Sequence, residues 1–237
     1  MESLTTTEQR EVNLNFYSMG SSAFNSSTIS TVIIHNPHPI YYLLKRLLDI
    51  ILAALCIVVL MPLAFVIAIV IKLDDGGKVF YFREMIGLDG RRFIMLKFRT
   101  MIPNADTYLE LHPELKLKFG ENMKLQHDPR VTRFGSFLRK IYLDELPQLF
   151  NVFVGHMSLV GPRAIHQGEL TLYGEYAEKR HSVKPGITGL WQISPDRHKC
   201  YEDRIPLDMQ YIDSRSLFLD FIILIKTLKV FIIPTGI

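Results

Sequence analysis

Residues 143–149 read Leu-Asp-Glu-Leu-Pro-Gln-Leu, and the rest of the chain is organised around this stretch. Asp is favoured at the start of a helix, and Pro is tolerated in the first turn because its missing N–H would be unpaired there. Gly155 suits the end of the same helix. The pattern predicts a helix that starts at the adjacent carboxylates Asp144 and Glu145 and runs toward Gly155.

Basic residues are dense on both sides of this acidic pair. They are Arg130, Arg133, Arg139, Lys140 and Arg163. A helix N-terminus carries roughly half a positive charge, which keeps nearby carboxylates ionised and also attracts phosphate. The plain alternative is an acidic helix start on a solvated basic surface. The density of Gly, Pro and Arg around the pair favours a chemical site instead.

An uncharged apolar run covers residues 50–71, and as a straight helix it would be ~33 Å long, enough to cross a bilayer core. Pro62 interrupts the run, so either a kinked spanning helix or a helix that breaks and returns to the same face fits. Lys45, Arg46 and Lys72 flank it on both sides. Because basic flanks prefer the cytoplasm, the charges favour the re-entrant form. A buried core helix is the alternative.

Composition limits the class of protein. With 48% apolar residues and a net charge of +3, the 237-residue chain is neither disordered nor collagen-like, and it can hold one medium domain plus a membrane element. Its mildly basic balance suits anionic lipids or phosphorylated substrates better than nucleic acid. The two cysteines indicate no disulfide framework and favour a reducing compartment. No Walker A or Gly-x-Gly-x-x-Gly element occurs, so neither a P-loop nor a Rossmann site is supported.

The pattern divides the chain into three parts: a flexible tail (residues 1–40), a membrane-inserted helix (41–73) and a cytoplasmic domain (74–237). Aromatic and apolar runs on both sides of Asp89-Gly90 predict a β-hairpin within residues 78–99. Helices are expected at 104–125, 133–142 and 168–181, and a turn followed by an apolar segment at 185–192. The apolar but charge-interrupted stretch 216–233 predicts an interfacial amphipathic helix. The expected fold is therefore α+β and mostly helical.

Seven stretches of the chain match one known family in sequence order. They are 45–49 (Lys-Arg-Leu-Leu-Asp), 97–101 (Lys-Phe-Arg-Thr-Met), 128–132 (Asp-Pro-Arg-Val-Thr), 138–139 (Leu-Arg), 143–152 (Leu-Asp-Glu-Leu-Pro-Gln-Leu-Phe-Asn-Val), 157–163 (Met-Ser-Leu-Val-Gly-Pro-Arg) and 185–192 (Pro-Gly-Ile-Thr-Gly-Leu-Trp-Gln). On these stretches the chain resembles the bacterial sugar transferases, also called monotopic polyprenyl-phosphate phosphoglycosyl transferases. It looks most like the short exopolysaccharide priming enzymes.

The resemblance implies an enzyme that transfers a sugar 1-phosphate from a UDP-sugar to undecaprenyl phosphate and releases UMP. It also implies a monotopic protein of the inner membrane, with a re-entrant helix and the catalytic domain on the cytoplasmic face. Its expected partners are the UDP-sugar, undecaprenyl phosphate and membrane lipid, with no nucleic acid, and a homodimer is compatible with it. The family's helix usually breaks at Ser-Pro, whereas this chain has Met61-Pro62.

The resemblance also implies roles for individual residues. Asp144 would be the nucleophile that forms a covalent phosphosugar intermediate, and Glu145 would bind the cofactor Mg²⁺. The residues expected to bind substrate phosphate are Arg139, Arg163, Lys97 and Arg99. Those expected to support the site are Pro147, Gln148 and Asn151. The chemistry agrees, because phosphate oxygens repel a carboxylate until cations neutralise them.

Two alternatives remain open at this point. One is a catalytically silent membrane scaffold, or lipid-phosphate-binding protein, of a polysaccharide assembly complex. The other is a metal-dependent phosphatase, which would use the same aspartyl chemistry with water as the acceptor. The first would be favoured by loss of the acidic pair or the arginines, and all of them are present.

Overall fold

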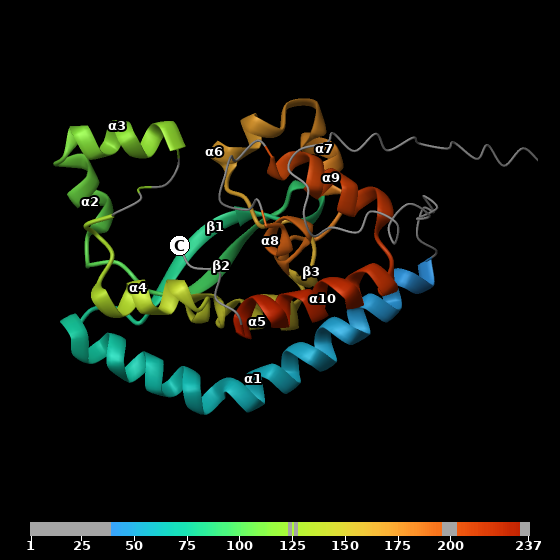
Figure 1. The fold of residues 1–237 in the computed structure, drawn as a ribbon, viewed down its shortest axis with the longest axis horizontal. Helices are drawn as coiled ribbons and strands as arrows, with labels where there is room; N and C mark the ends of the chain where they lie inside the picture. Colours follow the sequence, from blue (N-terminus) through green and yellow to red (C-terminus); the bar gives the residue numbers. More distant parts are fainter. Residues whose placement is uncertain (1–38, 123–124, 126–127, 196–202, 233–237) are drawn as a thin grey trace, which may run out of the picture. The chain divides into compact units, whose positions relative to one another are not determined.

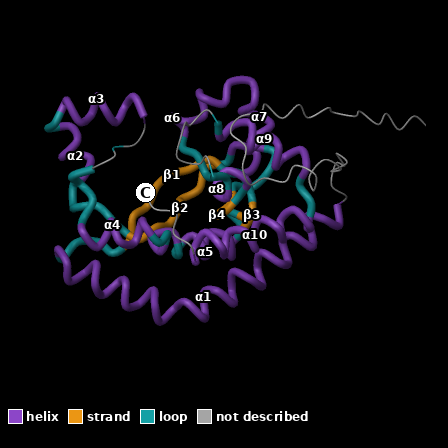
Figure 2. The backbone as a smooth tube through the Cα atoms, in the orientation of Figure 1, coloured by secondary structure: helices purple, strands orange, loops and turns teal. Residues whose placement is uncertain are grey.

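The computed structural model describes residues 39–122, 125, 128–195 and 203–232 (Figure 1). In chain order they form α1 (Pro39–Asp75), β1 (Phe80–Ile86), β2 (Arg92–Phe98), α2 (Ala105–Glu110), α3 (Pro113–Asn122), α4 (Arg133–Lys140), α5 (Gln148–Val154), β3 (Ser158–Val160), α6 (Gln167–Leu170), α7 (Ala177–His181), β4 (Gly186–Thr188), α8 (Leu190–Ile193), α9 (Arg204–Ser214) and α10 (Leu217–Ile232). Helices predominate, with two small strand pairs (Figure 2). The predicted mostly helical α+β class is confirmed.

Helix α1 is the long apolar helix expected near the N-terminus. It begins at Pro39, so residues 39 and 40 belong to it, and the rest of the expected tail lies outside the described residues. The helix continues through Pro62 to Asp75 and bends partway along its length (Figure 1). It is long and apolar enough to cross a membrane, and only 11% of its most apolar window is buried. Whether it re-enters one face stays a prediction.

The N-terminal half of α1 is fastened to the domain by charged side chains. The guanidinium of Arg46 donates to the carbonyls of Val152 (2.7 Å) and Phe153 (2.8 Å) in the last turn of α5. The carboxylate of Asp49 accepts from the Ser158 hydroxyl (3.1 Å) and the Leu159 N–H (2.9 Å) at β3. These polar contacts to α5 and β3 therefore fix the position of the N-terminal half of α1 against the domain.

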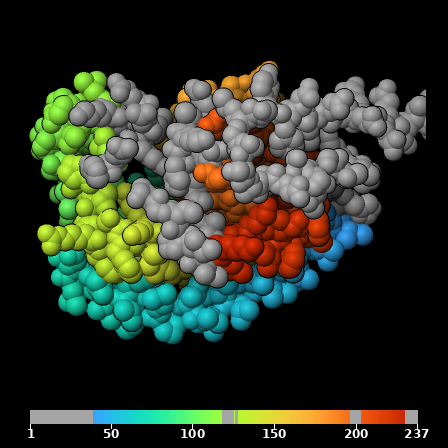
Figure 3. All heavy atoms as spheres, viewed as in Figure 1, coloured from blue at the N-terminus to red at the C-terminus, as the bar shows by residue number. Residues whose placement is uncertain are grey.

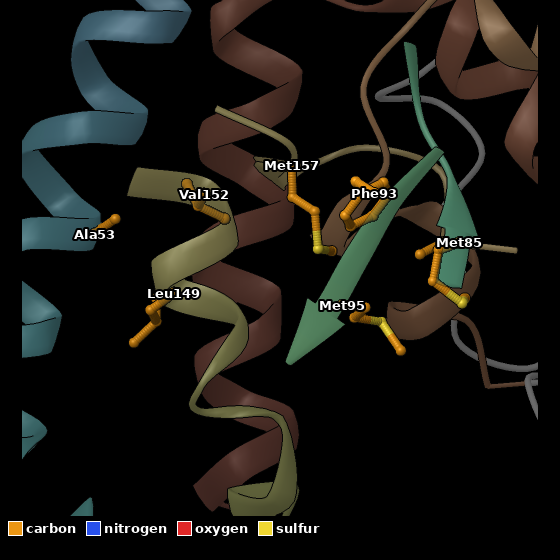
Figure 4. Packing of buried hydrophobic residues seen from close by; sticks show 8 residues of the cluster. Ala53, Met85, Phe93, Met95, Leu149, Val152 and Met157 are labelled. Carbon is orange, nitrogen blue, oxygen red and sulfur yellow. The ribbon is translucent and has the colours of Figure 1, made fainter. Parts of the chain in front are cut away.

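The predicted hairpin is confirmed as β1 and β2, which pair antiparallel from Phe80 opposite Phe98 to Ile86 opposite Arg92. Asp89 and Gly90 both adopt left-handed backbone angles (φ 56° and 72°), as the Asp-Gly pair predicts for a hairpin turn. Met85, Phe93 and Met95 of this hairpin lie in one buried cluster with Leu149 and Val152 of α5 (Figure 4).

Two other predicted helices are interrupted. The stretch expected as one helix at 104–125 forms α2 and α3, because Pro113 starts a new helix after Glu110. The stretch 168–181 is likewise divided between α6, the 3₁₀ turns Thr171–Tyr176 and α7, with Gly174 at φ 49°. In both places a residue that disfavours a continuous helix ends it.

A short parallel pair, β3 with β4, lies where only a turn and an apolar segment were expected. Its strands are three residues each, too short to give a clear alternating pattern. The backbones approach so closely that a Cβ on Gly186 would lie 2.1 Å from the Gly161 nitrogen. Gly186 must therefore be a glycine, because the Gly161-Pro162-Arg163 segment passes directly against it as it leaves β3.

The C-terminal helix α10 is amphipathic, as predicted. Phe218, Phe221, Ile225 and Leu228 are exposed at helical spacing on one face, whereas Asp220 and Ile223 are buried on the other. In Figure 3 the spheres of α1 form one edge of the described body, with those of α4 and α10 next to them. This edge therefore gathers the apolar surface that a membrane interface would cover.

Candidate active site

The acidic pair lies in a 3₁₀ turn, Leu143–Glu145, immediately before α5. The helix itself begins at Gln148, with Pro147 at its N-cap position. The prediction that the helix starts at Asp144 is therefore wrong by one turn, because Pro147 has no N–H to continue an α-helical ladder upstream. The predicted C-terminal stop at Gly155 is confirmed by its left-handed backbone (φ 97°).

Glu145 is held between two cations. Its Oε1 accepts from the Lys97 ammonium (2.7 Å) and from the Arg163 guanidinium (3.0 Å). Burial alone would raise the pKa of Glu145, but the charges of Lys97 and Arg163 hold it far below its usual range. The carboxylate is therefore ionised at neutral pH, and strand β2 and the segment after β3 meet through it.

Asp144 differs sharply from its neighbour. It is buried, yet among the described residues its carboxylate has no hydrogen-bond partner. Burial, together with the negative charge of Glu145, raises the pKa of Asp144 to about 6. The charges of Lys97, Arg139 and Arg163 act in the opposite direction. Asp144 is thus a weakly solvated carboxylate in a cationic setting with its oxygens unengaged.

Arg139 projects from α4 toward this site. Its Nε donates to the Thr100 hydroxyl (2.8 Å), and within the described part of the chain its two terminal nitrogens make no further hydrogen bond. Helix α4 approaches Thr100 so closely that a Cβ on Gly135 would lie 2.1 Å from the Thr100 carbonyl oxygen. Gly135 therefore sets the depth at which α4 presents Arg139.

Arg99 and Arg130 are engaged elsewhere. Arg99 binds the Asp75 carboxylate (Nη1 to Oδ2, 2.6 Å), which ties the end of α1 to the hairpin. Arg130 forms a buried pair with Asp128 (2.7 Å). The structure thus brings Lys97, Arg139 and Arg163 around the acidic pair but does not bring Arg99 into direct contact with it.

The supporting residues of α5 have clear structural roles. Asn151 is buried, its Oδ1 accepts from the Leu96 N–H (3.0 Å), and its Nδ2 donates to the Ile94 carbonyl (2.7 Å). It continues the hydrogen bonding of β2 on the strand's free edge, and so fixes the strand that carries Lys97. Gln148 is also buried, one turn earlier on α5.

Two buried arginines were not anticipated from the sequence. Arg180 and Arg204 both donate to the main-chain carbonyl of Arg163, at 2.7 Å and 2.6 Å. They fix the backbone from which Arg163 reaches Glu145. Arginine is usually exposed, so sequence patterning gave no signal that these two are buried.

The acidic pair also suits a magnesium ion. Among the described residues, no group of three His, Cys, Asp or Glu side chains is arranged as a metal site. However, Mg²⁺ is often bound by one or two carboxylates together with substrate phosphates and water. Glu145 uses Oε1 for its two cations, whereas Oε2 has no hydrogen-bond partner in the described part of the chain. One carboxylate oxygen is therefore available for a metal shared with a phosphorylated substrate.

Comparison with known proteins finds relatives along most of the chain. The family model described as bacterial sugar transferase matches residues 40–234. The exopolysaccharide production protein ExoY of Rhizobium meliloti (strain 1021) is 42% identical over 202 residues, covering 84% of this chain and 89% of that protein. The UDP-galactose-lipid carrier transferase of Erwinia amylovora is 44% identical over 79% of this chain and 40% of its own length. The undecaprenyl-phosphate galactose phosphotransferase of Salmonella typhimurium is 40% identical over the same shares.

Proposed function

The chain belongs to the bacterial sugar transferase family, and on that premise we propose that it transfers a sugar 1-phosphate from a UDP-sugar to undecaprenyl phosphate. The products are UMP and an undecaprenyl-diphosphate sugar. The names of the relatives from Erwinia and Salmonella support this reaction class, and the ExoY relative supports a role in exopolysaccharide synthesis. The chain spans nearly all of the ExoY relative but only about two fifths of the two longer ones.

The observation that carries the proposal is the unengaged carboxylate of Asp144 beside three cations. In the first step an Asp144 oxygen attacks the phosphorus that bears the sugar, and the bond from that phosphorus to the oxygen bridging to UMP breaks. UMP leaves with the electron pair of that bond. In the second step an oxygen of undecaprenyl phosphate attacks the same phosphorus and releases Asp144. Covalent capture divides one difficult transfer into two easier ones.

The cations around Asp144 supply the electrostatic part of the mechanism. The two phosphates of the donor are anionic and would repel a carboxylate. Arg139 has unengaged nitrogens at the site, and Lys97 and Arg163 meet at Glu145. Guanidinium groups bind phosphate in a two-point fashion, and preorganised charges of this kind stabilise the transition state without reorganisation. A Mg²⁺ ion bound by Glu145 would neutralise further charge on the donor phosphates.

The membrane element fits a lipid acceptor. Undecaprenyl phosphate cannot leave the bilayer, so its phosphate must be met at the membrane surface. Helix α1 packs under the site: Ile67 and Ile71 in its C-terminal half lie in one buried cluster with Leu138 of α4 and with Leu143 and Leu146, which flank the acidic pair. We infer that the domain sits on the cytoplasmic face of the inner membrane. The homodimer stays a prediction.

The test is a panel of UDP-sugars with undecaprenyl phosphate and Mg²⁺, with lipid and nucleotide products detected by mass spectrometry. We expect one sugar to give an undecaprenyl-diphosphate sugar and an equal amount of UMP. Free sugar phosphate without lipid product would instead identify a phosphatase, and no turnover with any donor would favour a scaffold. The same assay compares the variant Asp144→Asn with a matched control, Asp89→Asn. Asp89 is exposed in the hairpin turn, where Asn also tolerates a left-handed backbone.

A further inference from the structure

A cationic cavity lies at the N-terminal end of α1, away from the acidic pair. Its walls come from the first turns of α1, the turn between β1 and β2, strand β3, residues 182–184 and the end of α9, and its volume is about 240 Å³. None of its lining residues belongs to the Asp144–Glu145 cluster. From Arg46 at this cavity to Ile67 near the acidic pair, the chain runs ~30 Å along α1.

Four cations line this cavity, namely Lys45, Arg46, Lys184 and Arg215. Lys45 is neutralised by Asp220 (2.8 Å), and Arg46 donates to the carbonyls of Val152 and Phe153 in the last turn of α5. Asp49 is the single acidic residue among the lining side chains. The cavity therefore keeps an excess of positive charge after its internal pairs are made.

Lys184 lacks a partner among the described residues, and Arg215 keeps one free donor. Arg215 donates through its terminal nitrogens to the Ile212 carbonyl and to the Tyr42 hydroxyl (2.9 Å). Lys184 makes no hydrogen bond or ion pair with any described residue. Its Nζ and an Arg46 nitrogen both lie beside Gly155, 3.5 Å and 3.0 Å from where a Cβ on that glycine would be. Burial and the charge of Arg46 lower the pKa of Lys184. The Nε–H of Arg215 is buried without a partner in the described part of the chain. A buried donor without an acceptor destabilises the fold, so the Arg215 Nε–H would gain from a bound anion. Lys184 is half-buried, and its unpaired positive charge would attract the same anion.

The size of the cavity restricts the anion. Its volume of about 240 Å³ is about eight times the ~30 Å³ share of one water molecule in the liquid. That space suits a phosphate with a small glycerol-sized attachment. The apolar part of the lining, which includes Tyr41, Tyr211 and Val183, would pack against the attachment.

The position of the cavity identifies the source of this phosphate. Tyr42 and Lys45 line it from the same turns of α1 on which Ile40, Leu43 and Leu47 are exposed to solvent. Exposed apolar residues interleaved with cationic ones mark the boundary between acyl chains and headgroups. Tyr42 is itself exposed, as tyrosine often is at a membrane interface.

We propose that this cavity binds the phosphate of an anionic phospholipid headgroup, with Lys184 and Arg215 as its principal contacts. The bound lipid holds the N-terminal half of α1 at the membrane surface. This site is separate from the one that would accept undecaprenyl phosphate, and it does not depend on the reaction proposed above.

Native mass spectrometry of the full-length chain, released from neutral detergent, tests the proposal. With added phosphatidylglycerol we expect one saturable, tightly bound lipid, and much weaker binding of zwitterionic phosphatidylcholine. Lys184→Gln should weaken phosphatidylglycerol binding about 10- to 100-fold, the usual effect of losing one charge-assisted hydrogen bond. Because Lys184 holds no other described residue, the variant should keep the lipid-free melting temperature. Arg215→Lys, which keeps the charge but loses the Nε–H, should show a smaller loss.

Lys229→Gln is the matched control, since Lys229 is exposed on α10 outside the cavity and the change in charge is the same. Its binding of phosphatidylglycerol should equal that of the unmodified chain. Unchanged binding of phosphatidylglycerol in Lys184→Gln, or an equal loss of binding in Lys184→Gln and Lys229→Gln, would overturn the proposal. Displacement of the lipid by inorganic phosphate at millimolar concentration would also overturn it, because the cavity would then be a site for free phosphate.

Discussion

Asp144 and Asp220 are both buried carboxylates with cations near them, yet the protein treats them in opposite ways. Asp220 on α10 accepts hydrogen bonds from Tyr41 (3.2 Å), Lys45 (2.8 Å) and Tyr211 (2.8 Å). Asp144 accepts none from the described residues. The first carboxylate is fully satisfied and joins α1 to α9 and α10. The second has no hydrogen-bond partner and lies where the donor phosphate would bind. A buried carboxylate without partners therefore indicates a reactive role, whereas a buried carboxylate with partners indicates a structural one.

The largest expected effect is on turnover, and it distinguishes Asp144 from Asp220. Asp144→Asn removes the proposed nucleophile, so turnover should fall by about 10⁴-fold or more, as it does when other enzymes lose a nucleophilic side chain. Because the Asp144 side chain bonds to no described residue, the melting temperature of the variant should not fall. Product formation and thermal unfolding measured on the same preparation check both halves. Retained turnover would remove Asp144 from its role.

Asp220→Asn should show the reverse pattern. Removing the charge from a buried, multiply bonded carboxylate leaves Lys45 unpaired, and breaking such a buried pair costs about 3–5 kcal/mol of unfolding free energy. Turnover per folded molecule should stay near that of the unmodified chain. Denaturant unfolding in detergent, together with an activity assay normalised to folded protein, measures the two effects. A stable but inactive variant would break the comparison.

Arg163→Ala sharpens the comparison from the cationic side. The variant frees Glu145 from one of its two partners and removes the phosphate contact proposed for Arg163, so the donor KM should rise about 10- to 100-fold. The kcat should change less. Initial rates over a range of donor concentrations separate the two constants. An unchanged donor KM would show that Arg163 only fastens its own segment.

The smallest effect is a dependence on pH. Asp144 is active when ionised, and its pKa is raised to about 6, so the rate should fall as pH drops through about 6. The sign for stability is opposite. Because the folded state holds this proton more tightly than the unfolded state, ionising Asp144 between its ordinary pKa and about 6 destabilises the fold as pH rises. Asp144→Asn should lose that part of the pH dependence of unfolding, whereas Asp89→Asn should keep it.

Local patterns were sufficient for the larger elements. The uncharged run of α1, the Asp-Gly turn of the hairpin and the apolar spacing of α10 each depend on neighbours in sequence, and each was predicted. Pro113 was a readable break that the prediction of one helix at 104–125 overlooked. The β3–β4 pair was missed because three-residue strands show no period and their pairing depends on contacts distant in sequence.

The candidate site was predicted in composition but not in arrangement. The sequence predicts a site that includes the acidic pair, Lys97, Arg139 and Arg163, and the structure brings them together. Arg99 was expected with them but pairs with Asp75. The contrast between a bound Glu145 and a free Asp144, and the buried support from Arg180 and Arg204, depend on tertiary packing. Neighbouring letters in a sequence cannot distinguish two adjacent carboxylates by their partners.

The most direct test of the central claim is intact-protein mass spectrometry of enzyme quenched in acid shortly after the UDP-sugar is added without lipid acceptor. The account predicts a mass increase equal to one sugar phosphate, located on Asp144, absent in Asp144→Asn and lost when undecaprenyl phosphate is supplied. Lipid product formed at full rate with no such adduct at any quench time would contradict it, because the sugar phosphate would then pass directly from donor to lipid.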